Sequence, residues 1–205
     1  FISFIALTSM AGIALGVAAL IVVLSVMNGF QDELRNRILS VASPVEIRGL
    51  PDLKDWPEVA KAARTDKRVI ATAPYIAGQA MLTAGEVNRG VLIRGIDPKL
   101  EEGVADIGSH MKRGRLEDLK PGEFGIVLGS EVAQALGVGV GDSVLAITPQ
   151  GTVTPAGTLP RVKSFKVVGI FEIGMFEFDN GLALIDLADA QKLYRIDGVS
   201  GVRLK

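Results

Sequence analysis

The sequence contains no cysteine and a single histidine, His110, among its 205 residues. Without cysteine the chain cannot form a disulfide framework, a thiol nucleophile or a cysteine zinc site. One histidine cannot build a metal site from several imidazoles. A third absence is confined to one region: residues 1–31 carry no Lys, Arg, Asp, Glu or His, although the whole chain has 22 basic and 23 acidic residues.

This uncharged stretch predicts a transmembrane helix. Crossing the hydrocarbon core takes about 20 mostly apolar residues, and residues 2–30 exceed that length. A cleaved signal peptide has a shorter apolar region that ends at small residues. A buried helix of a soluble protein is usually shorter as well, and a helix lying in the membrane plane needs a charged face. These three alternatives fit the segment less well than a spanning helix.

Small residues repeat along this helix at Thr8, Gly12 and Gly16. Such spacing lets two helix backbones approach closely in lipid, so we predict a packing face for a partner helix. The alternative is that glycine and alanine are simply common in membrane helices. Apolar residues at four-residue spacing continue the helix beyond the membrane as a stalk, which should end before Pro44.

The remaining 170 or so residues mix both charge signs in near balance and predict a water-soluble α+β domain of alternating strands and helices. No basic field suggests nucleic acid as a partner. Two segments are rich in turn residues. Residues 148–165 predict an extended loop or a hairpin, and Asp179-Asn180-Gly181 predicts a hairpin turn between two apolar runs.

The search for catalytic or cofactor-binding motifs gives little. The chain has no Walker A sequence, so any ATPase must be a partner subunit. The glycines at 137, 139 and 141 follow a predicted helix and indicate a turn, not a phosphate loop. The carboxylates Glu172, Glu177 and Asp179 are expected to form a solvated face, and His110 to lie at the surface. A membrane-anchored enzyme is therefore the weaker alternative, and no catalytic residue, cofactor or metal is predicted.

Several segments together resemble one family of membrane proteins. They are Gly-Ile-Ala-Leu-Gly-Val at 12–17, Leu-Ser-Val-Met-Asn-Gly-Phe at 24–30 and Glu-Leu at 33–34, followed by residues 90–98, 125–129 and 165–171. In order and spacing they resemble the permeases of lipoprotein-releasing ABC transporters, the LolC/LolE family of the MacB/FtsX-like superfamily. The likeness runs along essentially the whole chain, and residues 27–30 are its most specific part.

The resemblance implies an architecture and a location. Residues 1–43 would be the first transmembrane helix with its stalk, and residues 44–205 a periplasmic domain, so the chain would sit in the bacterial inner membrane with residues after about 31 in the periplasm. The domain would combine porter-like α/β units, residues 44–91 and 165–205, with an inserted sabre-like part, residues 92–164. A hook loop would occupy residues 148–164.

The resemblance also implies partners and site residues. The partners would be a second permease subunit, a cytoplasmic ATPase subunit, a periplasmic lipoprotein chaperone and the lipoprotein substrate. An apolar cavity for lipoprotein acyl chains would use Val26, Met27 and Phe30, although these residues could equally pack on neighbouring helices. The hook that docks the chaperone would comprise Pro149, Gly151, Val153, Pro155, Leu159, Pro160, Arg161 and Lys163.

Two alternatives to the docking hook stay open. Residues 149–160 could be an ordinary flexible loop. A permease of the same superfamily that serves efflux or mechanical signalling would share the helix and domain but bind a different periplasmic partner.

Overall fold

The computed structural model describes residues 2–41, 45–154 and 157–205, which fall into two compact units divided between Ile38 and Leu39. The first unit consists of helix α1 (Ile2–Val41), which at 1.5 Å per residue is about 60 Å long. Within the described residues, α1 is the one helix that is long and apolar enough to cross a membrane, over Ile2–Glu33. All residues from 2 to 33 are exposed in this chain, so their apolar surface needs lipid or another chain to cover it.

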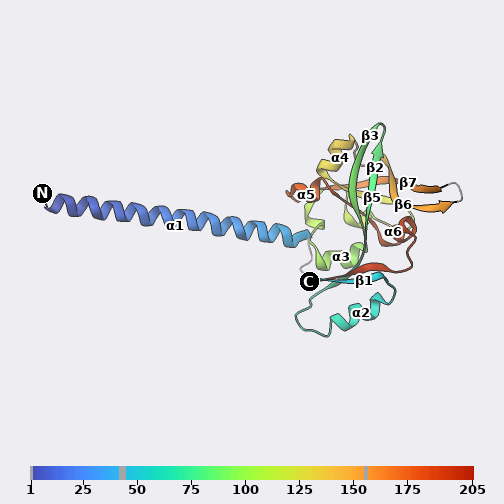
Figure 1. Cartoon of the computed structure of the whole chain (residues 1–205), viewed down its shortest axis with the longest axis horizontal. Coiled ribbons are helices and arrows are strands. Elements are labelled where there is room, and N and C mark those ends of the chain that lie inside the picture. The colour runs from blue at the N-terminus through green and yellow to red at the C-terminus, as the bar shows by residue number, and fades with distance from the viewer. Residues whose placement is uncertain (1, 42–44, 155–156) are drawn as a thin grey trace. The chain divides into compact units, whose positions relative to one another are not determined.

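The second unit is built, over the residues described, on one nine-stranded mixed sheet (Figure 1). Its strands run in the order β1-β9-β2-β3-β8-β5-β7-β4, and β6 pairs with both β2 and β7. The strands are β1 (Val45–Leu53), β2 (Thr72–Ala84), β3 (Val87–Ile96), β4 (Met111–Arg113), β5 (Gly125–Gly129), β6 (Ser143–Thr154), β7 (Gly157–Phe171), β8 (Leu182–Asp186) and β9 (Val199–Leu204). The helices of this unit are α2 (Trp56–Ala63), α3 (Pro98–Val104), α4 (Ser130–Leu136), α5 (Phe176–Asp179) and α6 (Leu187–Tyr194), with short 3-10 turns at Gly108–His110 and Leu116–Asp118.

Six of the strands form a closed circuit in which each strand pairs with the next. β2 pairs with β3, β3 with β8, β8 with β5, β5 with β7, β7 with β6, and β6 returns to β2. The β3–β8 and β5–β7 pairs are parallel and the others are antiparallel. This circuit surrounds the largest apolar core, to which α4 and α6 also contribute. The α+β domain preceded by one apolar helix is therefore confirmed.

The helix and turn between β5 and β6 form as their residues predict. β5 is buried along its whole length, as expected for an apolar strand with neighbours on both sides. Helix α4 follows directly and ends at Gly137, whose φ of 67° lies in the left-handed region that glycine adopts without strain.

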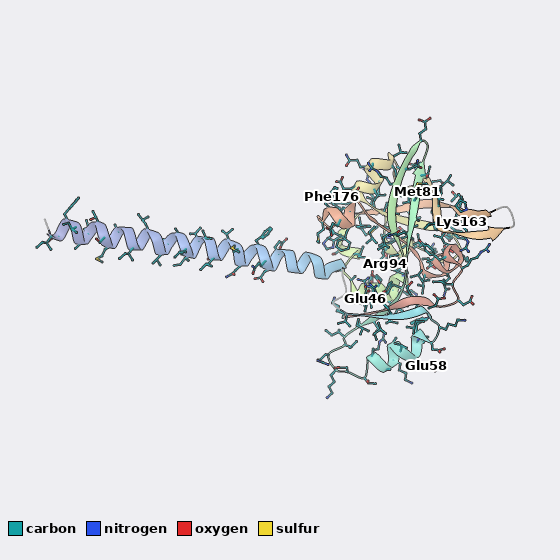
Figure 2. The ribbon with its side chains drawn as sticks, in the orientation of Figure 1. Glu46, Glu58, Met81, Arg94, Lys163 and Phe176 are labelled. Atoms are coloured by element: carbon teal, nitrogen blue, oxygen red, sulfur yellow. The ribbon has the colours of Figure 1, made fainter. Side chains whose placement is uncertain are left out.

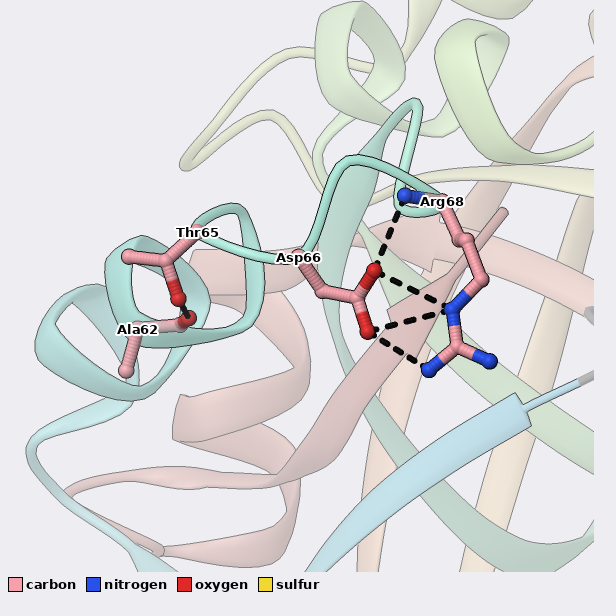
Figure 3. Close-up of polar contacts among 4 residues, drawn as sticks. All are labelled: Ala62, Thr65, Asp66 and Arg68. Atoms are coloured by element: carbon pink, nitrogen blue, oxygen red, sulfur yellow. Dashed lines mark hydrogen bonds and ion pairs between the residues drawn. The ribbon is translucent and has the colours of Figure 1, made fainter.

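The connection from α2 to β2 is fixed by short-range polar contacts (Figure 3). The Thr65 hydroxyl donates to the Ala62 carbonyl at 2.6 Å. The Asp66 carboxylate accepts from the Arg68 backbone N–H and from its guanidinium, with a shortest distance of 2.7 Å. These contacts hold the pKa of Asp66 below its ordinary value, chiefly through the Arg68 side chain.

A buried ion pair ties α3 to the outer part of the sheet. Arg203 of β9 and Glu101 of α3 are both fully buried and form an ion pair between Nη1 and Oε1. Arg94 of β3, labelled in Figure 2, is a third charge at this place, and burial, followed by the charge of Arg203, lowers its pKa. The charge of Glu101 opposes this lowering of the Arg94 pKa, so the carboxylate acts on Arg94 as well as on its partner Arg203.

The predicted hairpin turn at Asp179-Asn180-Gly181 is wrong. Helix α5 ends at Asp179, residues 180 and 181 form a turn after it, and β7 pairs with β4, β5 and β6 instead of with β8. The reason is the Asp179 side chain, which is 4% exposed and accepts hydrogen bonds from the N–H groups of Ile173 and Gly174 at 2.8 and 2.9 Å. A carboxylate used in this way closes a local turn before the helix, and the chain then crosses to a distant strand.

The division of the domain into porter-like and sabre-like parts stays a prediction. The structure clusters residues 39–205 as one compact unit. The six-strand circuit takes β2 and β8 from the predicted porter-like ranges and β5 and β6 from the predicted insert. The two predicted parts thus share one sheet.

Candidate functional site

The segment predicted as a hook is a two-stranded arm made by β6 and β7, and Figure 1 shows the two strands running out side by side. They pair from Ser143 with Lys166 to Thr148 with Arg161, and again from Thr152 with Leu159 to Thr154 with Gly157. Of the two structures predicted for residues 148–165, the hairpin is the one that forms over the described residues. Its strands are longer than predicted.

Two prolines mark the base of this arm. The register shifts between Thr148 and Thr152, so Pro149, residue 150 and Gly151 lie opposite Pro160 alone. Proline has no N–H for the strand ladder, and extra residues in one strand produce a bulge. The arm therefore leaves the sheet at a bulge that these prolines stabilise.

The other predicted hook residues belong to the arm beyond the bulge. Val153 pairs with Thr158, and Leu159 pairs with Thr152. Pro155 lies outside the described residues.

An apolar groove of about 780 Å³ opens at the base of the arm. Residues of four strands line it, among them Met81, Leu92, Ile147, Pro149 and Pro160. Met81, labelled in Figure 2, lies between Ile147 and Gly90 in the strand register. A Cβ at Gly90 would meet no atom within 4 Å, so the missing side chain leaves the groove open. With Met81 40% and Leu92 37% exposed, this is an apolar surface of the kind that marks interaction sites.

Arg161 and Lys163 lie on β7 and line a second, smaller cavity of about 380 Å³. The Lys163 ammonium is 3.6 Å from the centre of the Phe124 ring, a cation–π contact. Arg161 donates from Nη1 to the Leu193 carbonyl at 3.5 Å. Phe124, Lys192 and Arg195, which also line this cavity, were not predicted as site residues because they come from segments far apart in the sequence.

The residues predicted on α1 share one face of that helix. With 100° per residue, Thr8, Gly12, Gly16, Val26, Met27 and Phe30 all fall within a sector about 100° wide. The first three are small and the last three are large and apolar. Val26, Met27 and Phe30 are 66%, 54% and 63% exposed, and a Cβ at Gly12 or Gly16 would meet nothing within 4 Å.

Thr8 is compatible with a lipid environment although its side chain is polar. Its hydroxyl donates to the carbonyls of Phe4 and Ile5 within the same helix, both at 3.0 Å. A hydroxyl satisfied in this way needs no water, so it does not oppose insertion into a membrane.

The candidate acid–base groups do not converge. Glu172 forms an ion pair with Lys112 at 3.1 Å, while Asp179 is buried on backbone donors, so the predicted solvated face is wrong for Asp179. His110 is partly exposed, and its Nδ1 is 2.7 Å from the Asp106 carbonyl. Among the residues described, no group of three or more potential metal ligands is present.

Comparison with known proteins identifies the family to which this architecture belongs. The family model of the MacB-like periplasmic core domain matches residues 6–204. The chain is 51% identical over 208 residues to the lipoprotein-releasing system transmembrane protein LolC of Neisseria meningitidis, and 32% identical over 211 residues to LolE of Haemophilus influenzae. All of this chain is covered in both comparisons, and it spans 50% of each relative.

Solved structures show the same fold at low identity. The periplasmic region of MacB from Actinobacillus actinomycetemcomitans aligns with a TM-score of 0.51 and 14% identity, covering 78% of this chain and 65% of that one. The extracellular domain of the ABC-type transporter YknZ aligns with a TM-score of 0.50 and 12% identity, covering 79% and 74%. An apolar helix, a mixed sheet of this topology and the family match lead to one conclusion: the chain belongs to the MacB-like periplasmic core domain family, and within it is similar along its whole length to the transmembrane proteins of lipoprotein-releasing systems.

Proposed function

We propose that the chain is the first membrane helix and periplasmic domain of a permease subunit that releases lipoproteins from the bacterial inner membrane and passes them to a periplasmic lipoprotein chaperone. The observation that carries this proposal is the 51% identity to a LolC protein, which extends through the helix, the domain and the arm. The chain spans half of that relative, so the activity concerns the longer protein to which such a segment belongs. In this proposal the subunit is not catalytic, because a separate cytoplasmic ATPase subunit hydrolyses ATP.

The arm formed by β6 and β7 is the proposed docking element for the chaperone. Its base is held by the bulge at Pro149 and Pro160, and paired strands carry it away from the sheet. Strands that are already paired lose less conformational entropy than an unpaired loop when they insert into a partner. The apolar groove at its base offers a second contact surface for the same partner.

Replacing residues 149–160 by Asn-Gly tests this docking element. Thr148 and Arg161 are paired, so a two-residue turn joins them without disturbing the strands below. We expect binding of the purified chaperone to the chain in lipid nanodiscs to be lost, with an unchanged circular dichroism spectrum. The matched control replaces Gly85-Glu86, the turn between Ala84 and Val87 of the β2–β3 hairpin, by the same dipeptide and should bind normally. Unchanged affinity of the shortened arm would favour an efflux or mechanical permease instead.

The shared face of α1 is the proposed path for lipoprotein acyl chains. Its small residues would pack on a second permease subunit, and the larger Val26, Met27 and Phe30 would line the apolar cavity. A photo-crosslinking amino acid at position 27 should label the acyl chains of a bound lipoprotein in the assembled transporter. The same amino acid at Ser25, about 160° away around the helix, is the control. Equal labelling from both positions would show that lipid contact, not a cavity, produces the signal.

A further inference from the structure

One loop concentrates positive charge in a chain that is otherwise slightly acidic. Residues 64–71, which join α2 to β2, contain the cations Arg64, Lys67 and Arg68 and one carboxylate, Asp66. The rest of the chain has 19 basic and 22 acidic residues, from totals of 22 and 23. We name residues 64–71 the basic loop. Its net charge is opposite in sign to that of the remaining chain.

The basic loop also presents the most exposed large apolar side chain among the described residues of the domain. Ile70 is 81% exposed, whereas its neighbour Val69 is partly buried against the small core that contains Val202. The backbone fixes this part of the loop, because the Ile70 N–H donates to the Lys205 carbonyl at 2.6 Å. Cations beside an outward apolar side chain are typical of segments that bind at a membrane interface.

The cations of the basic loop are ordered but not neutralised. The Asp66 carboxylate pairs with Nε and Nη2 of Arg68, so Nη1 of this 89% exposed side chain stands outside the ion pair (Figure 3). Arg64 donates from Nε to the Thr72 hydroxyl at 2.8 Å. Lys67 is exposed and takes part in none of the ion pairs between described residues. The loop therefore keeps positive charge that an outside anion can reach.

The basic loop lies at the end of the sheet by which the domain is attached to α1. The chain enters the domain at Val45, 12 residues after the apolar span Ile2–Glu33 ends. Val45 pairs with Leu204 of β9, and Thr72, the residue after the loop, pairs with Leu204 from the other side. Two strand spacings, about 10 Å, therefore separate the entry point from the end of the loop. This short connection limits how far the loop can move from the membrane that holds α1.

We infer that the basic loop binds the anionic headgroups of phospholipids in the membrane that holds α1, with Lys67 and Arg68 on phosphate oxygens and Ile70 at the interface. Each cation close to an anionic membrane surface strengthens binding about fivefold, and the attraction fades within a Debye length. Such a contact restricts the tilt of the domain. It goes beyond the proposed release of lipoproteins, since it requires the inserted helix but neither cargo nor chaperone.

A fluorescent label close to the basic loop tests this contact in the full chain. The sequence has no cysteine, so Ala62→Cys, at an exposed position of α2, provides a single labelling site. The labelled chain is placed in nanodiscs whose lipid carries a quencher on its headgroup, made either of phosphatidylcholine or of phosphatidylcholine mixed with phosphatidylglycerol. We expect quenching about threefold stronger in the anionic discs, and high salt should remove the difference.

The variant Lys67→Gln combined with Ile70→Ser should reduce the quenching in anionic discs to the level seen in phosphatidylcholine. Both side chains are exposed, so the fold should not change. The matched control is Arg89→Gln combined with Val87→Ser, which removes the same charge and one apolar side chain at the exposed tip of the β2–β3 hairpin. This control should be quenched as strongly as the wild type.

Three results would overturn the inference. The first is equal quenching of the wild type in both lipids, or of the wild type and the loop variant in anionic discs. The second is quenching that follows the number of chains per disc instead of the lipid charge, which would assign the loop to a second copy of the chain. The third is an equal response to lipid charge from a label at Asn88→Cys on the hairpin tip, which would show a general attraction of the domain to the disc.

Discussion

Charge is used in opposite ways at two places in the domain. Glu101 and Arg203 are both fully buried, and their ion pair joins α3 to β9, with Arg94 adding a second cation nearby. The cavity lined by Arg161, Lys163, Lys192 and Arg195 also holds more cations than carboxylates, but it opens to solvent. Positive charge can therefore accumulate in the closed interior where a buried carboxylate pairs with it, and at an open cavity where solvent screens it.

The closed arrangement depends on the buried carboxylate of Glu101. Removing one partner of a buried ion pair leaves an uncompensated charge in a medium that solvates it poorly, which is far more costly than the pair itself is stabilising. Lys163 and Arg195 at the open cavity have no such dependence, because they are exposed and already screened by water and salt. Stability should therefore respond strongly at the first place and hardly at all at the second.

The largest effect is expected for Glu101→Gln. This change keeps the shape of the side chain but removes the carboxylate that forms the buried ion pair with Arg203, so we expect a loss of about 3–5 kcal/mol in the free energy of unfolding. Chemical denaturation of the chain in detergent measures it. The control is Glu102→Gln, at the exposed neighbouring position, which should change stability by less than about 0.5 kcal/mol. A change in stability as small as this for Glu101→Gln would contradict the difference drawn between the buried ion pair and the open cavity.

The smallest effect is expected for an ion pair that is well formed but exposed. Asp66 and Arg68 are 2.7 Å apart, with side chains 44% and 89% exposed. Because the Arg68 side chain and backbone lower the pKa of Asp66, the carboxylate contributes stability above the ordinary aspartate value, and that contribution is lost as the pH falls through the lowered pKa. Asp66→Asn should therefore lower the denaturation midpoint slightly at pH 7. The gap to the wild type should close below about pH 4, and a gap that persists in acid would show that packing, not charge, is responsible.

The elements with a strong local signal were predictable from the sequence. The absence of charge over residues 1–31 was sufficient to predict the apolar helix α1, because its length and composition suit a membrane span. A glycine directly after an apolar run marked the end of α4 at Gly137. The composition of residues 148–165 indicated a loop or hairpin, and the paired strands of the arm are the second of these.

The features that depend on distant contacts were not predictable. Asp179 reads as a turn residue, yet its side chain is buried on the backbone of residues 173 and 174, and a short helix ends at Asp179 before the turn at residues 180 and 181. The cavity lined by Phe124, Lys163 and Arg195 was not predictable because these residues come from segments far apart in the sequence and meet only in the folded domain. No pattern in one stretch of sequence contains this information, since it arises from strand order.

The position of β9 has a consequence for how the domain is made. β9 lies between β1 and β2 and pairs with both, although residues 45–53 are synthesised long before residues 199–204. The first strand to emerge thus waits with bare hydrogen-bonding groups until the last one arrives, as in other folds with distant pairings. Pairing of β1 is consequently completed only after β9 has been synthesised, and the interval before that is when the nascent chain is most open to proteases and to mispairing with its neighbours.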